Sequence, residues 1–289
     1  MPTAAEVVEA HRSDTRPFTA DGIASRTLDM GDGPTVVSIH GVPASSFLYR
    51  KVVPELAARG LRGIAFDLPG LGFADRPADH DYSWTGLGRF ATAALDALDL
   101  DEVHLVVHDI GGPVGFEMLH NAPDRIASLT ILNTLVDVAT FRKPWPMRPF
   151  EVPRVGEAWL ATMVPPAFRV IMRMLGIHDM GAVSKEELAA WLLLLRGDDG
   201  GKAFLQIMRS FETTQAKQDT YAAAISNHAL PKQVIWGEFD PALSIDVHGE
   251  AARRVAEVDV IHRLPGKHFL QEDNAPAIAE LVATFVATT

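Results

Sequence analysis

Hydrophobic positions along the chain follow two alternating patterns, short β-rich runs and longer stretches with helical spacing. Strands alternating with amphipathic helices predict a mostly parallel sheet covered by helices, the α/β class. The expected strands are residues 25–29, 35–40, 63–67, 103–108, 129–133, 233–237 and 259–264. The expected helices around them are residues 52–58, 85–98, 113–121, 248–255 and 276–285.

One region interrupts this alternation. Residues 135–228 contain no convincing buried strand, but helical spacing of apolar residues recurs at 157–163, 168–175, 185–195 and 202–211. Prolines cluster at the start of the region, and Pro231 follows its end. We therefore expect a core domain of residues 1–134 and 229–289 and a helical cap, or lid, of residues 135–228. Such a cap would build a pocket over the strand ends, where open α/β sheets bind ligands.

Composition narrows the class of protein. The 289 residues are 47% hydrophobic and 22% charged, as in an ordinary protein with a sizeable core. The formal net charge of −11 argues against nucleic acid and against an anionic membrane surface as partners. The N-terminus has no apolar segment typical of a secretory signal, so we expect a cytoplasmic protein. Without cysteine the chain has no disulfide or thiolate metal site, and the sequence carries no signal for oligomeric state.

The stretch LVVHDIGGPVGFEML, residues 105–119, carries the clearest chemistry. An apolar strand leads directly into Asp109, two glycines follow, and an apolar helix pattern begins at once. This is the strand, sharp turn and helix of a nucleophile elbow, with aspartate where serine is more common. Val107 stands where a glycine is more common. An aspartate is ionised at neutral pH, so it can attack an electrophilic carbon without a base to remove a proton.

Three further segments fit the elbow. His40-Gly41-Val42-Pro43 follows a strand, and there the backbone N–H of Val42, together with that of Ile110, would form an oxyanion hole. Asp240 lies on a turn after the strand 233–237, and His268 lies on a loop after the last strand. The chain order Asp109, Asp240, His268 is the order nucleophile, acid, histidine of the α/β-hydrolase fold.

Four motifs together make the chain resemble haloalkane dehalogenases and their relatives among the aspartate-nucleophile α/β-hydrolases, a branch that includes epoxide hydrolases. The motifs are HGVPASSFLYR (40–50), AFDLPGLGFADRP (65–77), VVHDIGGPVG (106–115) and GKHFLQED (266–273). The resemblance implies a hydrolase without a cofactor, acting on a small, largely apolar organic substrate and water.

The resemblance also implies a two-step mechanism. Asp109 would attack a carbon that bears a leaving group and form an alkyl-enzyme ester, and His268 would then activate the water that hydrolyses this ester. Asp240 would orient His268 and stabilise its cation. The family's alternative acid position follows the strand 129–133, where Asn133 cannot supply a charge and Asp137 lies nearby. We favour Asp240 over Asp137.

The residues that receive the leaving group depart from the family pattern. Dehalogenases usually have a tryptophan directly after the nucleophile, where this chain has Ile110, and Val42 replaces another frequent donor. Epoxide hydrolases, the alternative function, normally use two cap tyrosines, and here only Tyr221 lies in the cap region. We expect Trp145, Trp159 and Tyr221 to line the pocket.

Each motif also has a simpler interpretation. His40 and His108 are expected to be buried and hydrogen-bonded rather than catalytic. His104 and His108 could suggest a metal site, but the sequence offers no third ligand for it. Asp240 before Pro241 could simply open a turn. A non-catalytic α/β-hydrolase-fold protein that binds a small molecule is the alternative of another class, but such a protein would not need Asp109, Asp240 and His268 in this order.

Overall fold

The computed structural model describes residues 2–289 and contains one eight-stranded sheet. The strands lie in the order β1-β2-β4-β3-β5-β6-β7-β8. Strands β1 and β2 run antiparallel to their neighbours, and all other neighbouring pairs are parallel. The strand bounds are β1 Thr15–Ala20, β2 Ile23–Met30, β3 Thr35–Ile39, β4 Arg62–Phe66, β5 Val103–Asp109, β6 Ile126–Thr134, β7 Lys232–Gly237 and β8 Ile261–Leu264.

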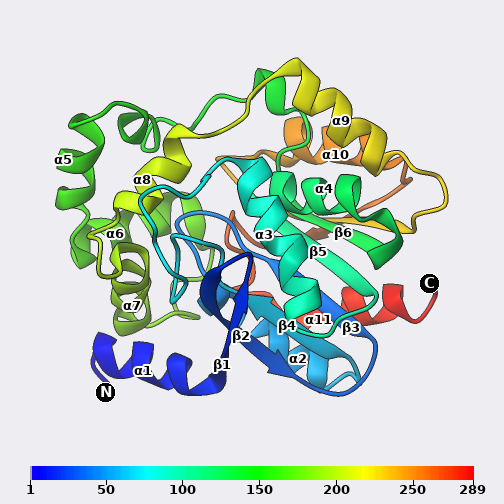
Figure 1. Ribbon diagram of the computed structural model, residues 1–289, viewed down its shortest axis with the longest axis horizontal. Coiled ribbons are helices and arrows are strands. Elements are labelled where there is room, and N and C mark those ends of the chain that lie inside the picture. Colours follow the sequence, from blue (N-terminus) through cyan, green and yellow to red (C-terminus); the bar gives the residue numbers. More distant parts are fainter. Residues whose placement is uncertain (1) are drawn as a thin grey trace.

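Helices cover both faces of this sheet (Figure 1). Helices α2 and α11 pack together on one face, and α3, α4, α9 and α10 lie on the other. The bounds of these helices are α2 Val52–Ala57, α3 Trp84–Ala97, α4 Gly111–Asn121, α9 Gln215–Ile225, α10 Glu250–Ala256 and α11 Ala275–Val286. The α/β-hydrolase class predicted from the sequence is confirmed, and each of the seven expected strands overlaps an observed one.

All regular secondary structure between β6 and β7 is helical. Helices α5 (Val155–Thr162), α6 (Pro165–Ile171), α7 (Lys185–Arg196) and α8 (Lys202–Arg209) lie to one side of the sheet, on the left in Figure 1. Helix α9 instead packs against α4 on the face of the sheet. The division into a core and a cap ending at residue 228 stays a prediction, and the packing of α9 favours an earlier end.

Three elements were not predicted, because none of them has a clear apolar pattern in the sequence. In β1 the strand TRPFTA exposes Arg16 and Pro17, and a proline is tolerated because β1 is an edge strand. Helix α1 (Ala4–Asp14) begins with a capping box between Thr3 and Glu6 and fully buries only His11. Helix α9 buries only two side chains, so it has no clear apolar stripe. Within residues 2–289 no helix is long and apolar enough to cross a bilayer.

Candidate active site

Asp109 lies at the sharp turn between β5 and α4. Its φ of 53° is in the left-handed region, which is strained for a residue with a side chain. The turn depends on close packing, because a Cβ atom at Gly111 would collide with the carbonyl oxygen of Ile39. Val107, which replaces the commoner glycine, is accommodated by Gly115 of α4, where a Cβ would collide with the Val107 side chain. The sequence thus meets the space requirement of the elbow with a glycine at a different position.

The carboxylate of Asp109 is held by two different groups. The backbone N–H of Val42 donates to Oδ1 at 2.7 Å, as the expected oxyanion hole requires. His268 Nε2 lies 3.3 Å from Oδ2, the other carboxylate oxygen. The close approach of the loop after β3 needs Gly41, because a Cβ there would collide with the Asp109 carboxylate. One oxygen is therefore fixed by the backbone, while the other faces the histidine.

His268 is oriented by Asp240, whose Oδ2 accepts a hydrogen bond from Nδ1 at 2.8 Å. Oδ2 of Asp240 also accepts from the side-chain amide of Asn133, at 2.7 Å, and Oδ1 accepts from two backbone N–H groups, those of Ala242 and Leu243. The structure therefore brings Asp240, and not Asp137, to His268. Sequence reasoning treated Asn133 only as a residue that cannot be the acid, and it missed this supporting contact.

The three ionisable groups shift one another's pKa. Burial disfavours a charge on His268, but the carboxylates of Asp240 and Asp109 outweigh burial and raise its pKa to about 10. Burial likewise opposes the charge on Asp109, yet the hydrogen bond and charge of His268, together with the backbone N–H of Ile110, lower its pKa. At neutral pH the site therefore consists of an ionised nucleophile, a histidinium and a second carboxylate.

The two neighbouring histidines are buried and neutral. His108 lies in contact with His268, and its Nε2–H donates to the backbone oxygen of His268 at 2.8 Å. Burial and the adjacent His268 cation lower the pKa of His108 to about 4. His40 Nδ1 bonds the carbonyl of Gly41, and its Nε2 accepts from the N–H of Leu68. Both residues therefore support the loops of the site.

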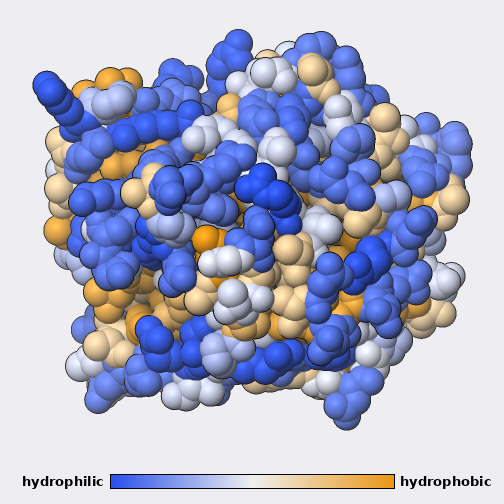
Figure 2. Space-filling view, viewed as in Figure 1, coloured by the Kyte–Doolittle hydropathy of each residue, from blue (hydrophilic) through white to orange (hydrophobic). Residues whose placement is uncertain are grey.

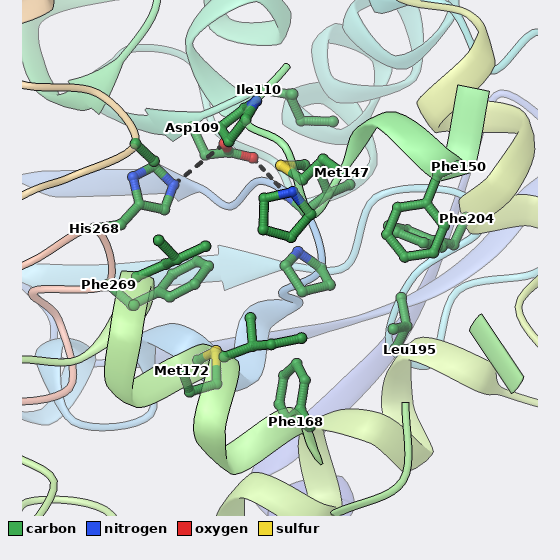
Figure 3. A pocket seen from close by; sticks show the side chains of 18 of the residues that line it. Asp109, Ile110, Met147, Phe150, Phe168, Met172, Leu195, Phe204, His268 and Phe269 are labelled. Atoms are coloured by element: carbon green, nitrogen blue, oxygen red, sulfur yellow. Dashed lines mark hydrogen bonds and ion pairs between the residues drawn. The ribbon is translucent and has the colours of Figure 1, made fainter. Parts of the chain in front are cut away.

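A cavity of about 110 Å³ opens in front of Asp109 and His268 (Figure 3). These two residues have the only ionisable side chains in its lining, which is otherwise apolar and rich in phenylalanine, methionine and leucine. In Figure 3, Phe168 and Met172 lie across the cavity from Asp109. The phenylalanines that line it are Phe141, Phe150, Phe168, Phe204, Phe211 and Phe269, and the methionines are Met147, Met163 and Met172.

The three residues expected to line the pocket are not in this lining. Trp145 is 62% exposed on the loop before α5, and the Trp159 indole N–H donates to the carbonyl of Pro146. Tyr221 is buried against α4, where its hydroxyl donates to Glu117 at 2.6 Å. Their large side chains suggested ligand contacts, but Trp145 faces solvent, and Trp159 and Tyr221 pack between loops and helices. The lining residues carry no polar signature in the sequence, so nothing in their chemistry distinguished them from core residues.

Comparisons with known proteins identify the family of this chain. The alpha/beta hydrolase fold family matches residues 34–275. A haloalkane dehalogenase of Mycobacterium marinum is 30% identical, over 96% of this chain and 93% of its own length.

Two solved structures share the fold at lower identity. A haloalkane dehalogenase from Bradyrhizobium elkani has a TM-score of 0.76 and 22% identity, and covers 95% of this chain and 98% of its own. An epoxide hydrolase from Vigna radiata has a TM-score of 0.78 and 19% identity, and covers 96% of this chain and 99% of its own. The chain belongs to the alpha/beta hydrolase fold family, as a haloalkane dehalogenase-like enzyme.

Proposed function

We propose that the protein hydrolyses carbon–halogen bonds of small apolar alkyl halides through a covalent ester on Asp109. The observation that carries this proposal is the position of the Asp109 carboxylate. It is ionised, held through Oδ1 by the backbone N–H of Val42, and faces an apolar cavity beside His268. The proposal includes a cap role for the helices between β6 and β7, supported by the many lining residues they and their loops supply.

In the first step Oδ2 of Asp109 attacks the carbon that bears the halogen. A carbon–oxygen bond forms, the carbon–halogen bond breaks, and the halide leaves with the bonding electron pair. The cavity holds few groups that would hydrate the carboxylate, so the nucleophile is more reactive than in water. The Val42 N–H keeps Oδ1 in place, so that Oδ2 is the oxygen presented to the substrate.

The direction of this attack decides which leaving groups suit the site. Displacement at a saturated carbon is in line, so the leaving group departs on the side away from Oδ2. His268 lies 3.3 Å from Oδ2 and so stands on the side of the nucleophile, where it cannot protonate a group departing on the other side. The far wall is apolar. A halide leaves without a proton, whereas the alkoxide from an epoxide requires one.

The second step returns the enzyme to its starting state. Once Asp109 is an ester it no longer carries a charge, so His268 loses one of the two carboxylates that raise its pKa. His268 therefore releases its proton to solvent as the halide departs, and the neutral histidine takes a proton from water through Nε2 while the hydroxide attacks Cγ of Asp109. The ester bond breaks, the alcohol leaves with a proton, and Asp109 keeps one oxygen from the water. Val42 N–H, and the Ile110 N–H with it, would stabilise the oxyanion of this step.

The test is intact-mass measurement of a His268→Gln variant after incubation with 1-bromobutane and, separately, with 1,2-epoxybutane. Without the base, the ester should accumulate. We expect a mass gain of one butyl group with release of bromide, and no gain with the epoxide. A gain equal to the whole epoxide would instead establish ring opening, the second function weighed from the sequence.

Two controls make the result specific. The double variant Asp109→Asn/His268→Gln should gain no mass, because the amide cannot attack. The wild type should turn over without accumulating an adduct. If His268→Gln gained no mass with either substrate while remaining folded, the protein would be a binding protein or a hydrolase for another electrophile.

A further inference from the structure

Exposed hydrophobic side chains are concentrated on one part of the surface. Six of the ten large hydrophobic side chains that are exposed in residues 2–289 lie between residues 145 and 174. They belong to α5, α6 and the segments beside them: Trp145, Val152, Val155, Val164, Val170 and Met174. In Figure 2 hydrophobic surface is visible on the side where Figure 1 shows α5. Exposed apolar side chains that gather on one part of a surface commonly mark an interaction site.

The same segment has a charge opposite to that of the chain. Residues 142–174 contain six basic and two acidic side chains, a formal net charge of +4 in a chain of net charge −11. Both acidic residues are already paired, Glu151 with Lys143 and Glu157 with Arg209. Five exposed arginines form no ion pair anywhere in residues 2–289: Arg142, Arg148, Arg154, Arg169 and Arg173.

These residues also lie over the cavity of the site. The segment 141–176 supplies twelve lining residues of the cavity in front of Asp109, among them Leu160 of α5 and Phe168 of α6. Helices α5 and α6 therefore direct apolar side chains inward to the cavity and outward to the surface. A helix with apolar side chains on two opposite faces is expected to be covered on both faces.

We propose that this outer surface docks on an anionic lipid bilayer. We call it the arginine–valine face, and it consists of the five exposed arginines and six hydrophobic side chains named above. Arginines at a lipid surface are attracted by anionic headgroups, while tryptophan and valine side chains enter the boundary of the acyl region. The whole-chain charge of −11 argues against such a partner, but contact depends on the charge of the face that approaches the membrane.

Charge favours a lipid surface over a second copy of the chain as the partner of the arginine–valine face. A two-fold dimer through the arginine–valine face would bring the same five arginines together from both copies, and like charges would oppose the contact. A lipid surface supplies the opposite charge as well as an apolar layer. Docking does not depend on the reaction at Asp109. If the proposed function holds, an apolar substrate dissolved in the bilayer would enter beside α5 and α6.

The experiment is flotation of the purified wild type with phosphatidylcholine vesicles, with and without about 30% phosphatidylglycerol, at about 50 mM and about 500 mM salt. We expect binding to the anionic vesicles at low salt and none to phosphatidylcholine alone. The double variant Arg154→Glu/Arg169→Glu should bind more than about tenfold less. The double variant Trp145→Ser/Val170→Ser should also bind less, because it loses apolar contact.

The matched control is Arg254→Glu/Arg263→Glu, which changes the net charge equally through two exposed arginines on α10 and β8. It should bind as the wild type does. Circular dichroism and melting curves would show that all variants are folded. The proposal fails if the wild type does not bind anionic vesicles, or if both arginine pairs reduce binding equally. It also fails if Val155→Asp dissociates a dimer of a wild type that binds no vesicles.

Discussion

Asn133 donates its side-chain N–H to Oδ2 of Asp240 at 2.7 Å, so an amide at the end of β6 holds the carboxylate that orients His268. Its own Oδ1 accepts from the backbone N–H of Gly237 at the end of β7, at 2.8 Å. The amide is therefore fixed at both ends and cannot turn away. Asp240 depends on a neighbouring strand for its position, and the replacement of Asn133 tests that dependence.

Replacing Asn133 by aspartate places two carboxylates side by side in a buried site. Like charges raise the pKa of one of them, and the pair then shares a proton at low pH. We expect kcat to fall at least about tenfold, because the contact to Asp240 is lost. The free energy of unfolding, measured in urea, should drop more at pH 8 than at pH 5. Asn133→Ala is the control, because it adds no charge and should lose similar stability at both pH values.

The raised pKa of His268 predicts how stability depends on pH. Unfolded, the histidine titrates near 6.5, and in the folded protein near 10, so the folded state holds its proton more tightly. This stabilisation is fully present below about pH 6.5 and is lost as the pH rises through about 10. Urea unfolding of wild type and His268→Gln should therefore give curves that converge from pH 6 to pH 10. Parallel curves would contradict a histidinium between Asp109 and Asp240.

Sequence reasoning identified the nucleophile region because its signals are local. A strand, an aspartate and two glycines indicate a sharp turn, and His268 and Asp240 follow strands whose order along the chain is readable. The cavity is different, because its wall is built by apolar residues from separate helices, such as Leu160 of α5 and Phe168 of α6. Such residues look like ordinary core positions, and only packing shows which of them face a cavity.

The errors have the same physical origin. Trp145 was assigned to the pocket for its size, but it lies on an exposed loop, and Tyr221 turns its hydroxyl to Glu117 on α4. The direction of a side chain depends on how its helix is rotated, and the weak apolar stripe of α9 did not indicate that rotation. The sheet was predicted because apolar residues dominate central strands such as β3, whereas β1 has only two buried apolar side chains, those of Phe18 and Ala20.

Gly41 is predicted to be required for catalysis rather than for folding. A Cβ at this position would collide with the carboxylate of Asp109, which would have to move away from Val42 and His268. We expect Gly41→Ala to lower kcat about 100-fold or more, since small displacements of reacting groups cost this much. Gly60→Ala is the control: its φ is +78° and nothing lies near its Cβ, so about 1 kcal/mol of stability should be lost without loss of activity. Equal activity of the two variants would contradict the role of Gly41.

Arg50 joins the loop that carries His268 to the helical insertion. It donates to both oxygens of Glu272, four residues after His268, at 2.6 and 2.8 Å, and to Glu187 of α7 at 2.7 Å. The Glu272 side chain is 1% exposed, and Lys51 lies 2.9 Å from its Oε2, so loss of Arg50 leaves this buried carboxylate with one cation instead of two. Arg50→Met removes charge-assisted hydrogen bonds to Glu272 and Glu187 and should therefore destabilise the protein by about 1.5–3 kcal/mol in urea unfolding.

The double variant Arg50→Met/Glu272→Gln tests whether that cost comes from the pair. Glu272→Gln removes the buried carboxylate to which Arg50 donates, so the double variant should be less destabilised than the sum of the two single variants. Additive effects would show that Arg50 acts by packing alone, over the ring of Phe47 which its guanidinium covers.

Ile110 tests the proposal for the leaving group, because its side chain lines the cavity and donates no hydrogen bond. Chloride holds its hydration more strongly than bromide, so an apolar wall penalises chloride more. The wild type should therefore strongly prefer 1-bromobutane to 1-chlorobutane. Ile110→Trp adds an indole N–H, and one well-placed donor to a developing anion contributes about 100-fold or more. We expect kcat/KM for the chloride to rise about tenfold relative to the bromide.

The matched variant is Ile110→Phe, which has a comparable aromatic bulk but no N–H. Both replacements fill part of a cavity of about 110 Å³ and should lower activity toward longer substrates alike. Only the tryptophan should change the ratio of chloride to bromide turnover. If phenylalanine changed that ratio equally, shape rather than hydrogen bonding would control the leaving group. If the wild type already turned over 1-chlorobutane and 1-bromobutane equally, a hydrogen-bond donor elsewhere in the site would have to bind the departing halide. The argument from an apolar wall would then fail.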